Sequence, residues 1–485
     1  MNSKPNPTAR IRQQGLRMSV LALAVTTLMG CAVWQRPAPA AAPALLDAAA
    51  LDLHGLELSP AAQQWWSAFA DPQLSALLSK ADSDSPTLAE ARARIRAAAA
   101  QLDLARAGNR PSVDAGAGIS EGRLSQNSVY PPPYGGSVGW QGQAAVSLDW
   151  TLDLWGRQAD LIAAAGQEQL ARRLQLEQAR LLLQGAIVQA YVEDQRATAL
   201  ATLADAAVAA RQQLLTISRL RADAGLDSRQ PEQEAEAALP RAQAEAVQAR
   251  SNAQLAEHAL IALSGGGSGL KAPQLDFDAV ISVPSELPVN LLARRPDVMA
   301  ARAAVAASED YRRAALKAWY PSINLSALAG FSAIGLDHLF TAGSRTWSAG
   351  PAISLPLYDD GHLRAGQLDS EANRDASVAA YNATVLNAVR QSADQLSLVQ
   401  SLLQQRQQQQ QVLAASQQSL QLATQRAAAQ LDDRRAELRA GLAQIDARRT
   451  DIAYAADLAL ARVRLLLALG GSFQPAATTY AVEKE

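Results

Sequence analysis

The sequence predicts a mainly helical protein with a few short strands, built as two copies of one unit, whose strands join those of other chains in a transmembrane β-barrel. Three observations carry this prediction: a long internal repeat, Ala- and Leu-rich stretches almost free of proline, and short segments in which apolar and polar residues alternate. A repeat of this length suggests a pseudo-symmetric architecture that closes into a ring with other chains.

The repeat is visible at several places along the chain. Arg-Pro-Ser-Val at 110–113 returns as Tyr-Pro-Ser-Ile at 320–323, and residues 221–229 return as 426–434, which makes the repeating unit roughly 200 residues long. We therefore predict these segments: a lipoprotein signal peptide over 1–30, an acylated tether over 31–60, a first repeat over 61–270, a linker over 271–290, a second repeat over 291–472, and a tail over 473–485.

Composition narrows the class of protein. Of the 485 residues, 49% are hydrophobic but only 5% are aromatic, which favours long helices over a thick aromatic core. The net charge of −2 argues against nucleic acid as the main partner. The body of the chain has no apolar stretch of about 18 residues, which excludes an ordinary transmembrane helix there.

The N-terminus resembles an export signal followed by a lipidation site. Basic residues precede an apolar run over 18–29 that is too short to span a bilayer. The only cysteine, Cys31, then follows a segment similar to the bacterial lipoprotein processing box, although Met29 replaces the usual small residue. We predict cleavage before Cys31 and a diacylated N-terminus, and Ala32 fits sorting to the outer membrane. The alternative is an unmodified cysteine near an ordinary cleavage site.

Four short segments alternate apolar and polar residues, at 113–120, 143–154, 323–333 and 352–357. Strands that are apolar on one side and polar on the other, about ten residues long, are typical of a transmembrane barrel with an aqueous lumen. Four strands cannot close such a barrel alone, so several chains would contribute. The competing interpretation is a soluble sandwich with one buried face.

Tryptophans and loops accompany these segments. Polar connections rich in glycine and proline, at 122–139 and 335–344, are interpreted as loops at the cell surface. Five of the eight tryptophans lie in or beside the strands, where an interfacial girdle would place them: Trp140, Trp150, Trp155, Trp319 and Trp347.

Two long helices separate the strand pairs, over 156–225 and from 361 to about 432. Close to seventy residues at 1.5 Å each form a rod on the order of 100 Å long. Returning helices follow over 233–263 and 437–469, and Pro240 is expected to bend or interrupt the first of them. A pair of coiled coils used as a spacer is the alternative, but helices beside amphipathic strands more plausibly continue the barrel.

Catalytic chemistry finds little support. The four histidines lack metal-ligand spacing, the sole thiol lies at the processing site, and no Gly-rich phosphate loop or nucleophile elbow is present. Asp359 and Asp360 resemble a turn and a helix N-cap more than an acid/base pair. We therefore predict that the protein is not an enzyme and uses no metal or cofactor.

Taken in order, several motifs resemble the TolC-like outer-membrane factors of bacterial tripartite efflux and type I secretion systems, especially the OprM/NodT-type lipoproteins. The resemblance spans about 65–473. Its marks are Trp65-Trp66 with Phe69, Asp71-Pro72, Leu-Asp-Leu-Trp-Gly at 152–156, Leu-Leu-Ala-Arg-Arg-Pro-Asp-Val at 291–298, Tyr-Pro-Ser-Ile at 320–323, and Leu-Gly-Gly at 469–471. Arg302 and Gln430 depart from the family pattern, and Gln430 leaves the second turn's geometry open.

The resemblance implies a homotrimer in the outer membrane, in which each protomer gives four strands to one twelve-stranded barrel and long helices to a periplasmic α-helical barrel. It further implies a passive exit duct for solutes, with a periplasmic adaptor (membrane fusion) protein, an inner-membrane pump and outer-membrane lipid as partners. A protein-secretion channel of the type I kind and a lipid-anchored coiled-coil structural spacer are the alternatives.

Charged residues gather at the turns between the long helices and the returning ones. We hypothesise that ion pairs between neighbouring helices hold a closed constriction at the periplasmic tip, and that the adaptor opens it by binding the open state more tightly. The candidate gate residues are Asp227, Arg229, Asp432, Asp433 and Arg434.

Overall fold

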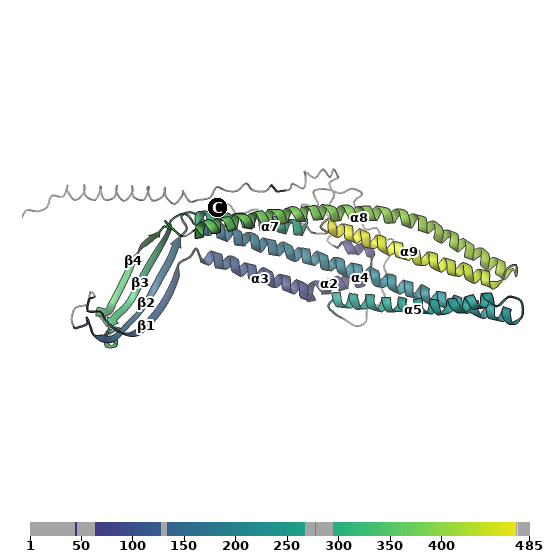
Figure 1. Ribbon diagram of the computed structural model, residues 1–485, viewed down its shortest axis with the longest axis horizontal. Helices are drawn as coiled ribbons and strands as arrows, with labels where there is room; N and C mark the ends of the chain where they lie inside the picture. The colour runs from purple at the N-terminus through teal and green to yellow at the C-terminus, as the bar shows by residue number, and fades with distance from the viewer. Residues whose placement is uncertain are drawn as a thin grey trace, which may run out of the picture. The chain divides into compact units, whose positions relative to one another are not determined.

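The computed structural model describes residues 44–45, 64–127, 133–266, 277, 294–359, 361–471 and 473. Its chain is mostly helical and contains one sheet (Figure 1). The elements in chain order are η2 (Trp65–Phe69), α2 (Pro72–Asp84), α3 (Pro86–Ala107), β1 (Ser112–Arg123), β2 (Val138–Leu152), α4 (Arg157–Asp223), α5 (Gln230–Leu263), α7 (Pro296–Lys317), β3 (Ser322–Ile334), η3 (Leu336–His338), η4 (Ala342–Ser344), β4 (Arg345–Ser354), α8 (His362–Ala428) and α9 (Arg434–Ala468).

The predicted duplication is confirmed. Each repeat gives a helix, a strand pair, a 67-residue helix and a returning helix, so α3-β1-β2-α4-α5 matches α7-β3-β4-α8-α9. The predicted signal peptide and Cys31 lie outside the described residues, as do most of the tether, the linker and the tail. The predicted segment boundaries therefore stay predictions.

The chain folds into two compact units, and both repeats contribute to each. The first unit includes residues 96–171 and 302–380 and holds the sheet, while the second includes 172–301 and 381–485 and holds the two helical turns. In the part of the chain that the structure describes, no helix is long and apolar enough to cross a membrane.

The sheet contains four antiparallel strands in the order β1-β2-β3-β4 (Figure 1). The pairing of β2 with β3 joins the two repeats, with Leu148 opposite Ala327 and Leu152 opposite Ile323. Because side chains alternate along a strand, the unbroken register sorts them onto two faces. Val113, Val146, Leu325 and Ile353 belong to one face, which we call the apolar face, and the other we call the polar face.

The fourth strand differs from the prediction. β4 covers Arg345–Ser354, whereas the alternation suggested a strand over 352–357. Leu355 and Leu357 therefore lie beyond the strand. Pro356 between them has no N–H to donate to a ladder. The segment that precedes 352 pairs with β3 instead, with Trp347 and Ala349 opposite Ala329 and Ala327.

The helices follow the predicted extents closely, with one exception. α4 and α8 end within a few residues of the expected turns, and α5 and α9 run back from them (Figure 1). The expectation that Pro240 bends or interrupts α5 is wrong with respect to interruption, because α5 is continuous from Gln230 to Leu263. Ala242 and Ala246 are buried just beyond the proline, and tertiary packing of a helix can offset the hydrogen bond that a proline removes.

Each long helix starts on an aspartate cap. Asp359 accepts from the backbone N–H of Leu363 at 2.5 Å and of Gly361 at 3.1 Å, as the N-cap interpretation predicts. In the first repeat, Asp153 does the same for Gln158 and Ala159 at 3.0 and 2.8 Å. These caps satisfy backbone N–H groups at the start of each long helix, shortly after the strand that precedes it.

The Leu-Trp-Gly segment after β2 anchors the neighbouring strand. Trp155 stacks on Tyr320 with ring centroids 5.4 Å apart, and its Nε1 donates to the Pro321 carbonyl at 2.7 Å. Gly156 takes a positive φ of 74°, and its carbonyl accepts from Lys317 Nζ at 3.1 Å. The motif therefore joins the start of α4 to the end of α7 and the start of β3.

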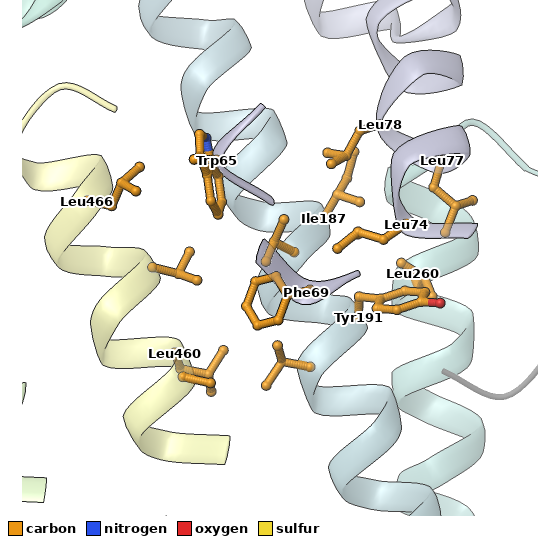
Figure 2. Close-up of a cluster of buried hydrophobic side chains, with 14 of the residues drawn as sticks. Trp65, Phe69, Leu74, Leu77, Leu78, Ile187, Tyr191, Leu260, Leu460 and Leu466 are labelled. Carbon is orange, nitrogen blue, oxygen red and sulfur yellow. The ribbon is translucent and has the colours of Figure 1, made fainter. Parts of the chain in front are cut away.

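The main core lies in the second unit, where η2 and α2 pack against α4, α5 and α9. Figure 2 shows Trp65 and Phe69 between Leu460 of α9 and Ile187 of α4. The buried Tyr191 hydroxyl donates to Asp71 Oδ2 at 2.6 Å and accepts from the Gln73 amide at 3.1 Å. Burial, followed by the Asp71 hydrogen bond, raises the pKa of Tyr191. This contact ties the N-terminal aromatic motif to α4.

The Arg-Arg-Pro-Asp motif has a structural explanation at Arg295, which is buried. Its guanidinium pairs with Asp297 at 2.7 Å and donates to the Ala468 carbonyl at the end of α9, also at 2.7 Å. Gly470, with a φ of 94°, passes over the Arg295 side chain. A cation at a helix C-terminus satisfies carbonyls that have no partner inside the helix, so Arg295 links the start of α7 to the end of α9.

The five tryptophans in or beside the strands differ in position and in solvent exposure. Trp140, Trp150 and Trp347 lie on the apolar face, and Trp140 and Trp347 are well exposed. Trp319 is buried before β3, so the expectation that it joins an exposed girdle is wrong for this chain's own fold.

Candidate functional site

The two helical turns form the first candidate site. Leu226 N–H donates to the Arg221 carbonyl at 2.9 Å and Gly225 N–H donates to Ala222 at 3.0 Å, with a φ of 71° at Gly225. This is the pattern of a Schellman helix end. It places the residues after Gly225 beside the last turn of α4, within reach of its side chains.

The second turn has the same backbone although a glutamine replaces the glycine. Gln430 adopts a φ of 56°, Leu431 N–H donates to the Arg426 carbonyl at 2.9 Å, and Gln430 N–H donates to Ala427 at 3.1 Å. The departure at Gln430 therefore leaves the turn geometry unchanged. The left-handed conformation costs a residue with a Cβ about 1 kcal/mol relative to glycine.

Around the first turn, two arginines share two carboxylates. Arg221 grips Asp227 in a bidentate pair at 2.8 and 3.2 Å, and Arg435 reaches from α9 to the same carboxylate at 2.7 Å. Arg435 also binds Asp433 at 2.6 Å, and Arg221 lies 3.6 Å from Asp433. Asp433 in addition caps α9 by accepting from the Arg435 backbone N–H at 3.1 Å. One network thus connects both turns of the chain.

The second turn keeps a separate pair. Arg426 binds Asp432 through two bonds of 2.5 and 3.2 Å, which repeats the Arg221–Asp227 geometry. Both partners are more exposed than their counterparts in the first turn. Among the described residues, no second arginine joins this pair.

The pKa values of the turn aspartates all shift in the direction that favours the charged form. Hydrogen bonds from Arg221 lower the pKa of Asp227, with Arg435 adding to the effect, and hydrogen bonds from Arg426 lower the pKa of Asp432. For Asp433, partial burial acts in the opposite direction, but the bonds from Arg435 outweigh it and lower the pKa. The carboxyl groups of the three aspartates are therefore ionised at neutral pH.

Three of the five predicted gate residues enter ion pairs: Asp227, Asp432 and Asp433. Arg229 and Arg434 are exposed and make no ion pair with the described part of the chain. The cations that do bind the aspartates, Arg221, Arg426 and Arg435, were not predicted. A signal existed for two of them, because an arginine stands six residues before an aspartate in both copies of the turn.

The polar face of the sheet is the second candidate site. Its side chains are small or uncharged apart from Asp114 on β1 and Asp149 on β2, which lie one register step apart near the ends of the strands that join the helices. Among the described strands, no lysine, arginine or histidine lies on this face. A wall of this kind suits contact with water.

Such a molecule belongs to the class of membrane channels that combine β-strands with long helices: one face of the sheet is apolar, the other is polar, and each strand pair continues into a long helix. The chain belongs to the outer membrane efflux protein family, whose pattern matches residues 77–266 and 287–471.

Two characterised relatives are similar over most of their length. The fusaric acid resistance protein FusA of Burkholderia cepacia is 33% identical over 365 residues, which cover 72% of this chain and 68% of that protein. The outer membrane protein OprJ of Pseudomonas aeruginosa is 30% identical over 482 residues, covering 96% of this chain and 97% of that protein.

The fold agrees with solved structures. The outer membrane protein VceC of Vibrio cholerae matches with a TM-score of 0.77 and 28% identity, covering 86% of this chain and all of that one. The predicted fold class is thereby confirmed, and the chain is an outer-membrane channel of a tripartite efflux system.

Proposed function

We propose that three copies of this chain close their sheets into one twelve-stranded barrel, with a polar lumen and an apolar outer surface. The observation that carries this proposal is the sheet itself. β1 and β4 are its edge strands, and unpaired strand edges are too costly to leave in lipid, so only a closed sheet satisfies them. A sheet of four strands is too small to close on itself, so the missing pairs come from other copies.

The apolar face matches the thickness of a membrane. It runs along β2 from Trp140 to Trp150, and these eleven residues of strand span roughly 35 Å. Tilted as barrel strands are, this gives an apolar band about 25 Å tall. Trp140 and Trp150 lie near its two ends, where interfacial tryptophans are found.

The proposed mechanism is passive conduction. An inner-membrane pump and a periplasmic adaptor deliver the solute, and this chain conducts it outward without chemical catalysis. Among the relatives, FusA is named for resistance to fusaric acid and MdtP of Shigella flexneri for multidrug resistance. These names support small organic molecules, rather than secreted proteins, as the cargo.

Reconstitution tests the channel. The detergent-purified protein is expected to migrate as a heat-sensitive trimer and to give stepwise ion conductance in planar bilayers. A water-soluble monomer without conductance would contradict the barrel and favour the coiled-coil spacer.

We further propose that Cys31 is diacylated and anchors the N-terminus in the outer membrane. Mass spectrometry of the mature chain would show an N-terminal cysteine carrying lipid, and Cys31→Ser would abolish that modification. An unmodified N-terminus at any other residue would contradict the anchor.

We propose that the turns form the periplasmic gate, with Asp432, Asp433 and their arginine partners holding it closed. The pairing of arginines with aspartates across the two turns supports this role. Trimers that carry Asp432→Ala and Asp433→Ala together should conduct more current than the parent. Unchanged conductance would rule out the gate.

A further inference from the structure

The connection between β3 and β4 folds back onto the apolar face of the sheet. A Cβ built on Gly142 would come within 3.0 Å of Leu339 Cδ2 and 3.2 Å of Leu336 Cδ2. Gly142 belongs to the apolar face, because it alternates with Gln143 and lies opposite Ala333. The two leucines of the loop thus fill the space that the missing side chain leaves.

A second contact places the loop on the same face. Phe340 meets Phe331 edge to face, with ring centroids 5.6 Å apart. Phe331 lies opposite Ala144 and shares the apolar face with it. Leu339 is 6% exposed and therefore buried under this contact, whereas Phe340 stays 72% exposed and Trp347, on the same face of β4, 79% exposed.

The polar groups of the loop satisfy one another. The His338 carbonyl accepts from the Thr341 and Ser344 hydroxyls at 2.8 and 2.7 Å, and from the Thr341 N–H at 3.1 Å. These internal bonds reduce the number of polar groups that the loop would have to desolvate at a membrane interface.

We propose that this connection is a membrane hook, in which the exposed Leu336 and Phe340 lie among the acyl chains of the outer leaflet just below the headgroups, while the buried Leu339 seats the loop on the sheet. The hook rests on the proposed barrel and refines it. Its occupant is lipid because the loop continues the lipid-facing band of the sheet, and Arg345 at the same register row as Phe331 supplies the cation expected at headgroup level. The loop predicted to be an exposed, polar excursion is therefore partly a lipid contact.

Spin labelling of the reconstituted full-length protein tests the hook. In a Cys31→Ser background, Phe340→Cys is compared with Val146→Cys on the apolar face and Ser348→Cys on the polar face. We expect the label at 340 to resemble that at 146, with a collision rate for oxygen several-fold higher, relative to a water-soluble nickel chelate, than the label at 348.

The outcomes separate the hook from the barrel. If 340 behaves like 348 while 146 remains lipid-exposed, the hook is wrong and the barrel stands. A label at 340 shielded from both reagents indicates a protein partner, such as a second copy, and also overturns the hook. If 146 and 348 are equally accessible to the nickel chelate, the barrel itself is wrong.

A steric variant supplies an independent readout. Gly142→Val should displace the leucines and reduce the oxygen preference of the label at 340. Gly139→Val is the matched control on the same strand, because a Cβ there meets no atom within 4 Å. An unchanged label in Gly142→Val would contradict the seating of the loop on this glycine.

Discussion

The two helical turns share one backbone and differ in their surroundings. In both, the second residue after the helix is left-handed and an arginine pairs with the aspartate six residues later. At the first turn that pair is joined by Arg435 and Asp433, whereas the pair at the second turn has only itself among the described residues. The same local motif therefore takes part in a shared ion-pair network at the first turn and forms a single ion pair at the second.

The source of the difference is the divergence of the repeats. Asp433 and Arg435 occupy the places that Ser228 and Gln230 hold in the first copy. The second copy thus supplies two extra charges, which pair with each other and also contact Arg221 and Asp227 of the first turn. An isolated exposed ion pair contributes little to stability, while a shared and less exposed network contributes more. We therefore expect the network at the first turn to hold the helix pair α4–α5 against the helix pair α8–α9.

Arg435→Ala is expected to have the largest effect. It removes the side chain that hydrogen-bonds both Asp227 and Asp433, and leaves the two carboxylates to share Arg221, which lies 3.6 Å from Asp433. We expect a several-fold rise in bilayer conductance. Arg434→Ala is the matched control, because this neighbour is exposed and makes no ion pair with the described chain. Equal rises in conductance in the two variants would contradict a specific role for the ion pairs of Arg435.

Asp227→Asn and Asp432→Asn compare the two turns directly. Asp227 receives bonds from two arginines and Asp432 from one, so Asp227→Asn should raise conductance clearly more than Asp432→Asn. The measurement is single-channel conductance of each trimer at the same salt concentration. The reverse order would mean that contacts outside this chain, such as those between protomers, govern the gate.

The pH dependence of the turns should be flat in the physiological range. The folded-state pKa values of Asp227, Asp432 and Asp433 lie below the ordinary value of 3.8, so their stabilisation is fully present above about pH 4 and is lost only as the pH falls through the lowered values. Conductance should therefore stay constant from pH 7 to pH 5. A rise within that interval would assign the gate to another group.

Asp194, in the middle of α4, contrasts with the turn aspartates because its pKa is raised. Burial, and then the charge of Glu257, raises its pKa to about 6. Because the folded state holds this proton more tightly than the unfolded one, the associated stability falls as the pH rises from about 4 to 6. Asp194→Asn should raise the thermal midpoint of the trimer at pH 7.5 and change it little at pH 4. A similar gain at both pH values would contradict the raised pKa.

Exchanging the residues at the left-handed positions gives the smallest effects. Gly225→Ala should destabilise the first turn and Gln430→Gly should stabilise the second, each by about 1 kcal/mol, because only glycine adopts this conformation without a steric cost. Thermal unfolding of the two variants tests the pair. Opposite signs confirm that the turns share one backbone, and equal signs would refute it.

Much of the architecture could be predicted without coordinates. The alternation of apolar and polar residues predicted β1, β2 and β3, and the long segments without proline predicted α4 and α8. Both predictions succeed because the period of a strand or of an amphipathic helix is visible in the order of its residues. The fourth strand was misplaced by several residues, because the alternation of Ile353, Leu355 and Leu357 predicts a strand that continues past Pro356, whereas the segment 345–354 pairs with β3. The Asp359 cap and the charged turns were also readable, because both depend on residues within one or two helical turns.

By itself, the sequence determined the duplication, the strand faces and the identity of the charged residues at the turns. Only the tertiary structure decided that Arg435 serves Asp227, that Arg295 closes the end of α9, and that Leu336 and Leu339 fill the space above Gly142. The physical reason is the distance along the chain over which each interaction acts. Periodicity and capping are local, whereas these contacts join segments far apart in the chain, and their partners follow from how the helices and strands pack.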